Sequence, residues 1–199
     1  MSLSSKPASV ESGDSLALLS HAQKGDAESF SELCRLHEAR LLRQATLLCP
    51  NSPEDLVQEC LFAAWKSLPK YNRQCQFFTW LCAIMLNQHR NMRRKRWPLS
   101  FAALFNPNTT EDDFAHLADH SHTPDHAAEL SDRSIFVQSC IRRLSPKHRE
   151  VIHLRFYVDG SLDGIAIALG CSVGTVKSRL FHALENLRKM IHTAQQRGI

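Results

Sequence analysis

The chain lacks the features that mark membrane proteins, exported proteins and most enzymes. No stretch of about 18 consecutive apolar residues occurs, so we expect no membrane span. Residues 1–13 are polar and Ser-rich, without the apolar core of a signal peptide, and we therefore expect a cytoplasmic protein. A Gly-rich phosphate loop and a credible Ser/His/Asp order are also missing, so we predict neither an enzyme nor a bound cofactor.

Cysteine pairs with metal-ligand spacing are absent as well. The seven Cys residues form no Cys-x-x-Cys motif, and their scatter through helical patterns favours buried thiols in a reducing compartment. Two sensor hypotheses stay open. One is a redox pair of Cys75 and Cys82, which would require a lowered thiol pKa. The other is a Zn²⁺ or Cu²⁺ site, although its His spacing fits no closed structural zinc site; its candidate ligands are His116, His120, His122 and His126.

Charge is distributed unevenly along the chain. Residues 1–96 carry a net charge of +4 and residues 133–199 a net charge of +7, whereas residues 97–132 contain seven acidic residues and no Lys or Arg. Two basic blocks separated by an acidic one indicate two domains that face nucleic acid. We divide the chain into a disordered N-terminus (1–13), an N-terminal domain (14–97), a flexible acidic linker (98–132) and a C-terminal domain (133–199).

Hydrophobic periodicity predicts an all-α fold. Apolar residues recur at three- and four-residue steps through both basic blocks, as one face of a helix requires. Helices are expected over 14–24, 27–49, 54–68, 77–97 and 133–144, and then on both sides of a turn at residues 159–160. In the second of these helices the buried side is predicted to contain Phe30, Leu33, Leu36, Leu41, Ala45 and Leu48.

Residues 162–180 have the spacing of a helix-turn-helix. Ala166 is small enough for two helices to cross, Gly170 provides a left-handed turn, and Val176 plugs the second helix into the first. Ser161 and Ser172 are candidate N-caps. The remaining inner positions follow helical spacing and are Ile165, Leu169, Val173, Leu180, Leu184 and Leu187.

The opposite side of the second helix suits the major groove of DNA. It combines cationic, hydroxyl and aromatic side chains, which can meet phosphates and base edges. An ordinary three-helix bundle with a solvated third helix is the plainer alternative. The candidate DNA-binding residues are Thr175, Lys177, Ser178, Arg179, Phe181 and His182.

A second basic surface is predicted on the helix at 77–97. Its Asn and Arg side chains recur at i, i+3, i+4 and i+7 after an aromatic segment, a combination that can track phosphates and stack unpaired bases. Trp80 and Leu81 are expected to pack in the core, whereas Tyr71 in the preceding loop is expected to be freer to meet a base. The candidate residues are Tyr71, Asn72, Arg73, Asn87, Arg90, Asn91 and Arg94.

Four strings of residues together carry a family resemblance. They are SPEDLVQECLFAAW at 52–65, FTWL at 78–81 continuing to Asn87, LSPKHREV at 144–151, and GCSVGTVKSRL at 170–180 preceded by Ile165 and Ala166. In this order the chain resembles an extracytoplasmic-function sigma factor of the sigma-70 family, over roughly residues 14–97 and 133–191. The last string is highly specific in that setting, and alone it would indicate only a helix-turn-helix.

The resemblance implies a division of labour between the two domains. The first, sigma region 2, would bind the β′ clamp of core RNA polymerase through Asp55, Gln58 and Glu59, a face otherwise interpreted as solvated. It would also open the −10 promoter element, with Tyr71, the loop 72–76 and Asn87 capturing a flipped base. The second, sigma region 4, would read the −35 element and touch the β flap, while the acidic linker would follow the RNA-exit path.

An anti-sigma protein is a further partner that the resemblance implies. The chain departs from the family pattern at Ala83, where a larger polar or cationic side chain is common, and at Asp163-Gly164, which replaces paired acids. Gly164 costs its helix about 1 kcal/mol relative to Ala. A stand-alone helix-turn-helix regulator that binds duplex operators as a dimer is the main alternative, although such a regulator has no need of the basic helix at 77–97.

Overall fold

The computed structural model describes residues 13–96 and 132–196, and every regular element within these ranges is helical. The N-terminal half contains α1 (Gly13–Gln23), α2 (Ala27–Leu48), α3 (Pro53–Ser67), a short 3₁₀ turn η1 (Leu68–Lys70) and α4 (Phe77–Arg96). The C-terminal half contains α5 (Asp132–Arg142), α6 (Pro146–Ile152), a π-helical turn η5 (His153–Tyr157), α7 (Leu162–Leu169) and α8 (Val173–Gln196). The all-α prediction is confirmed.

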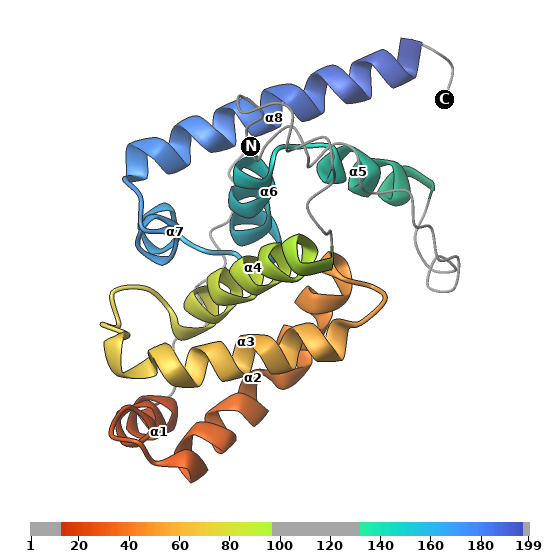
Figure 1. Cartoon of the computed structure of the whole chain (residues 1–199). Coiled ribbons are helices and arrows are strands. Elements are labelled where there is room, and N and C mark those ends of the chain that lie inside the picture. Colours follow the sequence, from red (N-terminus) through yellow and green to blue (C-terminus); the bar gives the residue numbers. More distant parts are fainter. Residues whose placement is uncertain (1–12, 97–131, 197–199) are drawn as a thin grey trace, which may run out of the picture.

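Helix α4 lies where the two halves meet (Figure 1), because it packs against α2 and α3 on one side and against α7 and η5 on the other. The long helix α8 runs across α5, α6 and α7 at the far side of the C-terminal half. The predicted linker, with its four His residues, and most of the predicted disordered N-terminus lie outside the described residues.

Capping residues explain where several helices begin. Asp26 caps α2, since its Oδ1 accepts a hydrogen bond from the Glu28 backbone N–H at 3.1 Å and its Oδ2 accepts one from Ser29 Oγ at 2.5 Å. Pro53 occupies the first turn of α3, where its missing N–H costs nothing. These local signals make the break between α1 and α2, and that between α2 and α3, readable from sequence.

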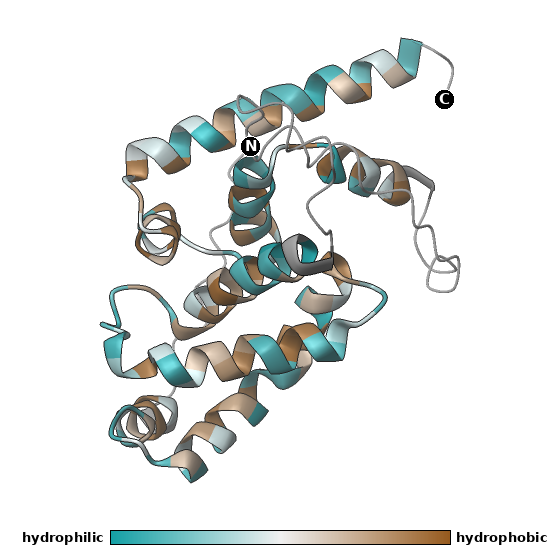
Figure 2. Cartoon of the chain, viewed as in Figure 1, coloured by the Kyte–Doolittle hydropathy of each residue, from teal (hydrophilic) through white to brown (hydrophobic). Residues whose placement is uncertain are grey.

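The buried faces of the helices join in a continuous apolar core (Figure 2). In α3 the apolar positions Leu56, Val57, Cys60 and Ala64 are buried at the three- and four-residue steps that the sequence predicts for its helices. In α2, however, the prediction for Leu36 is wrong, since 52% of that residue is exposed. His37 takes the inward position instead, with its ring centroid 5.6 Å from that of Phe77 and 5.7 Å from that of Phe78.

No single helix among the described residues has both the length and the apolar composition of a membrane span. Helices α7 and α8 have that length and composition only when they are taken together, and the chain bends by 103° between them.

Candidate nucleic-acid interface

The helix-turn-helix in the C-terminal half is built by local signals. Ser161 Oγ accepts a hydrogen bond from the Gly164 N–H at 3.0 Å, and Ser172 Oγ accepts one from the Thr175 N–H at 3.1 Å, so both predicted caps are confirmed. Gly170 adopts the left-handed conformation (φ 62°, ψ 39°) that ends α7. The 103° bend between α7 and α8 lies in the range typical of the motif.

Burial divides α8 into an inner and an outer face. Val176, Leu180, Ala183 and Leu187 are buried, a stripe with steps of four, three and four residues. The prediction that Leu184 belongs to this stripe is wrong, since 46% of it is exposed. Each residue advances about 100° around a helix, so Leu184 lies beside Ala183 and outside the packed stripe.

The outer face of α8 presents the side chains chosen for DNA contact. Lys177, Ser178, Phe181 and His182 are exposed, with Phe181 65% exposed, whereas Thr175 and Arg179 are half-buried at its edges. The Phe181 and His182 rings meet edge to face at 5.4 Å. An exposed aromatic ring beside cations and a hydroxyl on a helix-turn-helix is a surface suited to a DNA groove.

The loop between η1 and α4 is ordered by Tyr71, and the expectation that its ring is free to meet a base is wrong for this structure. Only 6% of Tyr71 is exposed, and its hydroxyl donates a hydrogen bond to the Cys75 carbonyl. The ring packs against Trp80 at a centroid distance of 4.8 Å and against Phe77 at 5.7 Å. Tyr71 therefore supports the loop from inside.

Gln23 of α1, which the sequence did not single out, holds this loop from outside. Its amide nitrogen donates to the Tyr71 carbonyl at 2.7 Å and to the Leu68 carbonyl at 3.2 Å. Its Oε1 accepts two hydrogen bonds from Arg73, whose guanidinium also reaches Ser20 Oγ at 2.9 Å. Arg73 adopts a left-handed backbone (φ 61°), so these contacts stabilise a conformation that costs a non-Gly residue free energy. No local sequence signal predicts a pairing fifty residues apart.

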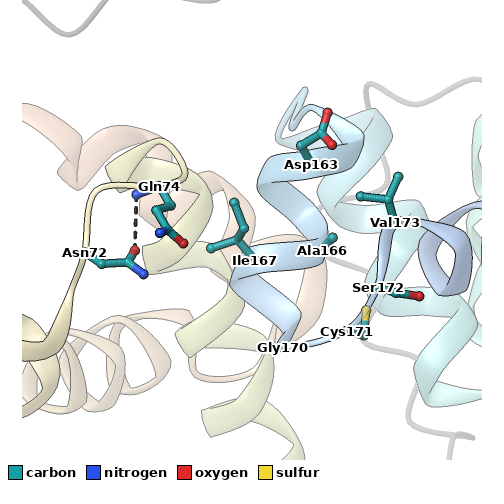
Figure 3. Close-up of a pocket in the computed structure, with 9 residues that line it drawn as sticks. All are labelled: Asn72, Gln74, Asp163, Ala166, Ile167, Gly170, Cys171, Ser172 and Val173. Atoms are coloured by element: carbon teal, nitrogen blue, oxygen red, sulfur yellow. Dashed lines mark hydrogen bonds between the residues drawn. The ribbon is translucent and has the colours of Figure 1, made fainter.

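The tip of the loop faces α7 across an open cavity of about 600 Å³. Asn72 and Gln74, both exposed, line one side, with Asn72 Oδ1 accepting a hydrogen bond from the Gln74 N–H at 3.1 Å. Ile167 of α7 points toward them from the other side (Figure 3). The base-binding loop predicted from the N-terminal half is thus brought beside the helix-turn-helix.

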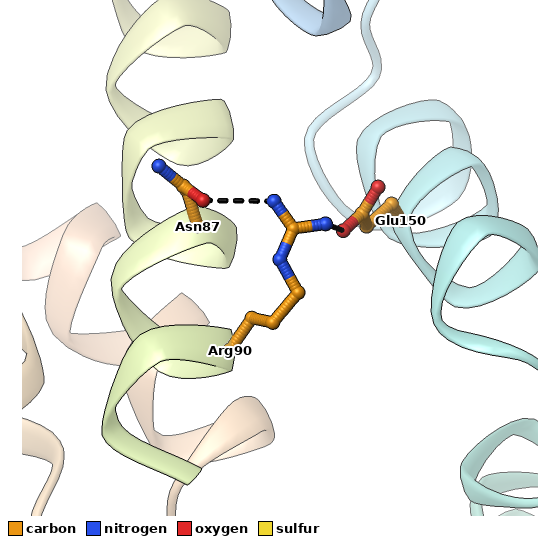
Figure 4. A network of polar contacts seen from close by, with 3 residues as sticks. All are labelled: Asn87, Arg90 and Glu150. Atoms are coloured by element: carbon orange, nitrogen blue, oxygen red, sulfur yellow. Dashed lines mark hydrogen bonds and ion pairs between the residues drawn. The ribbon is translucent and has the colours of Figure 1, made fainter. Parts of the chain in front are cut away.

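The polar stripe on α4 also faces the C-terminal half. Arg90 Nη2 donates to Asn87 Oδ1 at 2.8 Å, and Arg90 Nη1 pairs with Glu150 Oε1 at 3.1 Å (Figure 4). Asn87 and Arg90 are exposed, whereas Asn91 is half-buried. The side chain of Arg94 lies outside the described part of the chain.

The proposed polymerase-binding face of α3 is solvent-exposed along its length. Asp55, Gln58 and Glu59 are all exposed, and Phe62, one turn further, is 59% exposed. Lys66 Nζ lies 4.0 Å above the centre of the Phe62 ring. Phe62 adjoins this face and was not among the residues that the sequence indicated for it.

The sensor hypotheses gain no support from the described residues. Within these ranges no group of three or more His, Cys, Asp or Glu residues is arranged to hold a metal ion. Cys75 and Cys82 are buried, and burial raises the pKa of the Cys82 thiol well above its usual range. A raised thiol pKa disfavours the reactive thiolate, so a redox role for this pair is not favoured.

Each half of the chain matches a family of known proteins. The family models for Sigma-70 region 2 and Sigma-70, region 4 match residues 33–98 and 140–189. RNA polymerase sigma factor NccH of Alcaligenes xylosoxydans xylosoxydans is 33% identical over 90% of this chain and 95% of its own length. ECF RNA polymerase sigma factor SigL of Mycobacterium tuberculosis is 31% identical over 92% of this chain and 99% of its own.

The chain belongs to the sigma-70 family, among its ECF sigma factors.

The protein is therefore an alternative sigma factor, which binds DNA in transcription initiation. The hypothesis of a stand-alone helix-turn-helix regulator is not favoured. Its fold is shared with the sigma factor RpoE of Bartonella quintana, solved in complex with the anti-sigma factor NepR. That structure aligns with a TM-score of 0.59 at 24% identity, over 83% of this chain and 98% of its own.

Proposed function

We propose that residues 14–97 form the domain that binds core RNA polymerase and the −10 element, and residues 133–199 the domain that reads the −35 element. The β′ clamp of core polymerase binds the exposed α3 face of Asp55, Gln58 and Glu59, with Phe62, one turn further along α3, as an apolar anchor. Exposed aromatic residues amid polar neighbours are typical anchors of protein interfaces. The β flap contacts the C-terminal domain.

Recognition of the −35 element rests on the outer face of α8. Lys177 and Arg179 reach phosphates or guanine edges, and Ser178, Phe181 and His182 complete the contact with base edges. Thr175 lies near the N-terminal end of the helix, where a recognition helix approaches the groove most closely. The burial of Val176, Leu180 and Ala183 on the opposite side fixes which residues point outward.

Opening of the −10 element rests on the loop 72–76 and the α4 stripe. Flipping a base costs a few kcal/mol of unstacking, which hydrogen bonds from Asn72 and Asn87 help to offset. Arg73, Arg90, Asn91 and Arg94 follow the backbone of the separated strand. Tyr71, buried in this structure, contributes by shaping the loop, and stacks on a base only if the loop rearranges.

A cellular location and one further partner complete the proposal. The protein acts in the cytoplasm on promoter DNA as part of polymerase and catalyses no reaction itself. An anti-sigma factor regulates it, a proposal supported by the complex of the similar RpoE with NepR.

The observation that carries this proposal is the exposed cationic and aromatic face of α8 on a well-capped helix-turn-helix. The test is transcription in vitro with purified core RNA polymerase and a pool of randomised promoters, with and without the protein. Transcripts that appear only with the protein, and share two spaced elements, are expected. No transcripts together with no binding to core polymerase would overturn the proposal in favour of a free-standing duplex-binding regulator.

A further inference from the structure

Arg90, which is proposed to contact DNA, forms an ion pair within the protein itself. Arg90 of α4 forms an ion pair with Glu150 of α6 at 3.1 Å, across the meeting of the two halves. Only 13% of the Glu150 side chain is exposed, against 47% of that of Arg90. A carboxylate so far removed from water is strongly destabilised unless a cation accompanies it. The ion pair is therefore partly buried, and Glu150 depends on it more than an exposed carboxylate would.

Glu150 is shared by the two DNA-binding surfaces. Burial raises the pKa of the Glu150 carboxyl, and nearby cations oppose this rise, chiefly Arg90 and Arg179 and to a lesser extent Lys147. These four residues line one cavity of about 390 Å³, together with Trp80, Ala83, Ile84, Leu86, Asn87, Ala168 and Leu169. One carboxylate is thus placed among arginines from the predicted −10 helix and the predicted −35 helix.

A further contact holds the halves together away from this ion pair. Gln44 of α2, which is 9% exposed, donates to the Tyr157 carbonyl of η5 at 3.3 Å. Gly164 of α7 also lies near the −10 loop, since a Cβ there would be 3.0 Å from Ser161 Oγ and at an ordinary van der Waals distance of 3.6 Å from Cys75 Cβ. Helix α7 thus packs close to the N-terminal half.

We infer that this sigma factor closes on itself when alone, with Glu150 as a latch that binds Arg90 and neighbours Arg179, so that neither DNA-binding surface is fully available. That closure masks DNA-binding residues rests on the proposed function, which assigns Arg90 and Arg179 to DNA contact. DNA binding requires Arg90 to break its ion pair with Glu150 and Arg179 to turn away from the cavity that it shares with this carboxylate. The apparent affinity for promoter DNA is accordingly reduced by the fraction of molecules that are open.

The test measures the distance between the halves in the full-length protein without polymerase. Spin labels are placed on azide-bearing non-canonical residues at exposed Glu38 of α2 and Asn186 of α8, which avoids the native cysteines, and pulsed electron resonance gives the distance distribution. The protein with Glu150 and Arg90 unchanged is expected to give one narrow distribution of distances. Glu150→Ala removes the shared carboxylate and is expected to broaden and lengthen the distribution, with the short-distance fraction falling several-fold.

Matched variants separate the latch from general charge and folding effects. Glu185→Ala removes an equally charged residue from α8 and is expected to leave the distribution narrow. Arg90→Gln changes only an exposed position of α4 and is expected to open the molecule as Glu150→Ala does. Arg90→Lys keeps a cation opposite Glu150 and is expected to keep the molecule closed. Circular dichroism checks that each variant keeps its helical content.

A broad distribution in the unmodified protein would overturn the inference, as would a narrow one in both Glu150→Ala and Arg90→Gln. If Glu150→Ala fails to fold, Arg90→Gln and Arg90→Lys decide the question. The distance measurement does not depend on transcription. Failure of the randomised-promoter experiment with the expected distances would reject the proposed function and leave the closed state standing, and the converse result would reject only the latch.

Discussion

At the scale of single residues, the most informative side chains are those in environments that their chemistry does not favour. Phe62 is a large apolar residue left in solvent, and His153 is an ionisable one enclosed in the core, with 59% and 6% of their surfaces exposed. Each of these placements costs free energy in the isolated protein. Each therefore makes a prediction that can be checked by a single substitution.

Phe62→Ala is expected to weaken binding to core polymerase by roughly 1–2 kcal/mol, about 5- to 30-fold in Kd, because an exposed aromatic anchor is lost from the α3 face. Titration of fluorescently labelled protein with core polymerase measures the change. Phe181→Ala is the matched control, since it removes an equally exposed ring from the recognition helix. Equal losses for both variants would contradict a special role for Phe62.

His153 predicts a loss of stability in acid. Burial, and to a lesser extent His89, lowers the pKa of His153 from 6.5 to about 4. The folded state thus resists a proton that the unfolded state accepts. The stabilising contribution of neutral His153 is complete above pH 6.5 and is lost progressively as the pH falls toward 4, by an amount on the order of 3 kcal/mol.

Urea unfolding at several pH values between 7.5 and 4.5 measures this dependence. His153→Phe keeps a ring beside Tyr157, whose ring centroid lies 5.5 Å away, but cannot titrate. Its free energy of unfolding is expected to fall less steeply with acid. His192→Gln, at an exposed position of α8, should keep the original steepness. An unchanged steepness in His153→Phe would show that other groups govern acid unfolding.

At the scale of elements, the loop before α4 shows how one helix prepares another for function. The loop is held by Tyr71 from the core side and by Gln23 of α1 from the solvent side. Holding a loop before its partner arrives reduces the ordering cost of binding. The role of α1 is consequently one of support for the proposed −10 surface.

Gln23→Ala is expected to slow promoter opening without weakening −35 recognition. The substitution removes the amide that bonds the Tyr71 carbonyl and the acceptor that bonds Arg73. Permanganate reactivity of unpaired thymines in polymerase–promoter complexes measures opening, and competition with duplex −35 DNA measures the other contact. His21→Ala, an exposed neighbour on α1, is the control. Equal opening by both variants would mean that the loop needs no support from α1.

At the scale of the whole molecule, charge is the property that both halves share. The basic blocks flank an acidic one, and the cations proposed for DNA contact belong to both α4 and α8. Two modest contacts joined on one polymerase gain from effective concentration, so neither needs high affinity alone. Each phosphate contact also releases counterions from DNA, which makes binding depend on salt.

Promoter affinity of the polymerase complex is therefore expected to fall linearly with the logarithm of salt concentration. Lys177→Ala should reduce the slope by about one, because one phosphate contact is removed. Filter binding or fluorescence anisotropy from low to moderate salt gives the slope. Arg188→Ala, at an exposed position three helical turns beyond Lys177 on α8, is the control and should keep the slope. Identical slopes for Lys177→Ala and the unmodified protein would remove Lys177 from the DNA contact.

The helices and the outward face of the recognition helix follow from local amino-acid patterns. Gly170, Ser161 and Ser172 act within a few residues of their own position, and helical periodicity assigns Phe181 and His182 to the side opposite Val176, so no distant contact was needed. Edge positions of the helical stripes were less certain. Leu36 and Leu184 were wrongly assigned to the core, because which edge packs depends on the neighbouring helix.

The contacts that hold and cover the proposed site depend on how distant helices pack together. Gln23 pairs with Arg73, and Glu150 with Arg90, fifty and sixty residues apart in sequence. Tyr71 is buried because α4 supplies Phe77 and Trp80 around its ring. Such contacts form when separate helices pack and remove their polar groups from water together. A local sequence pattern does not predict them.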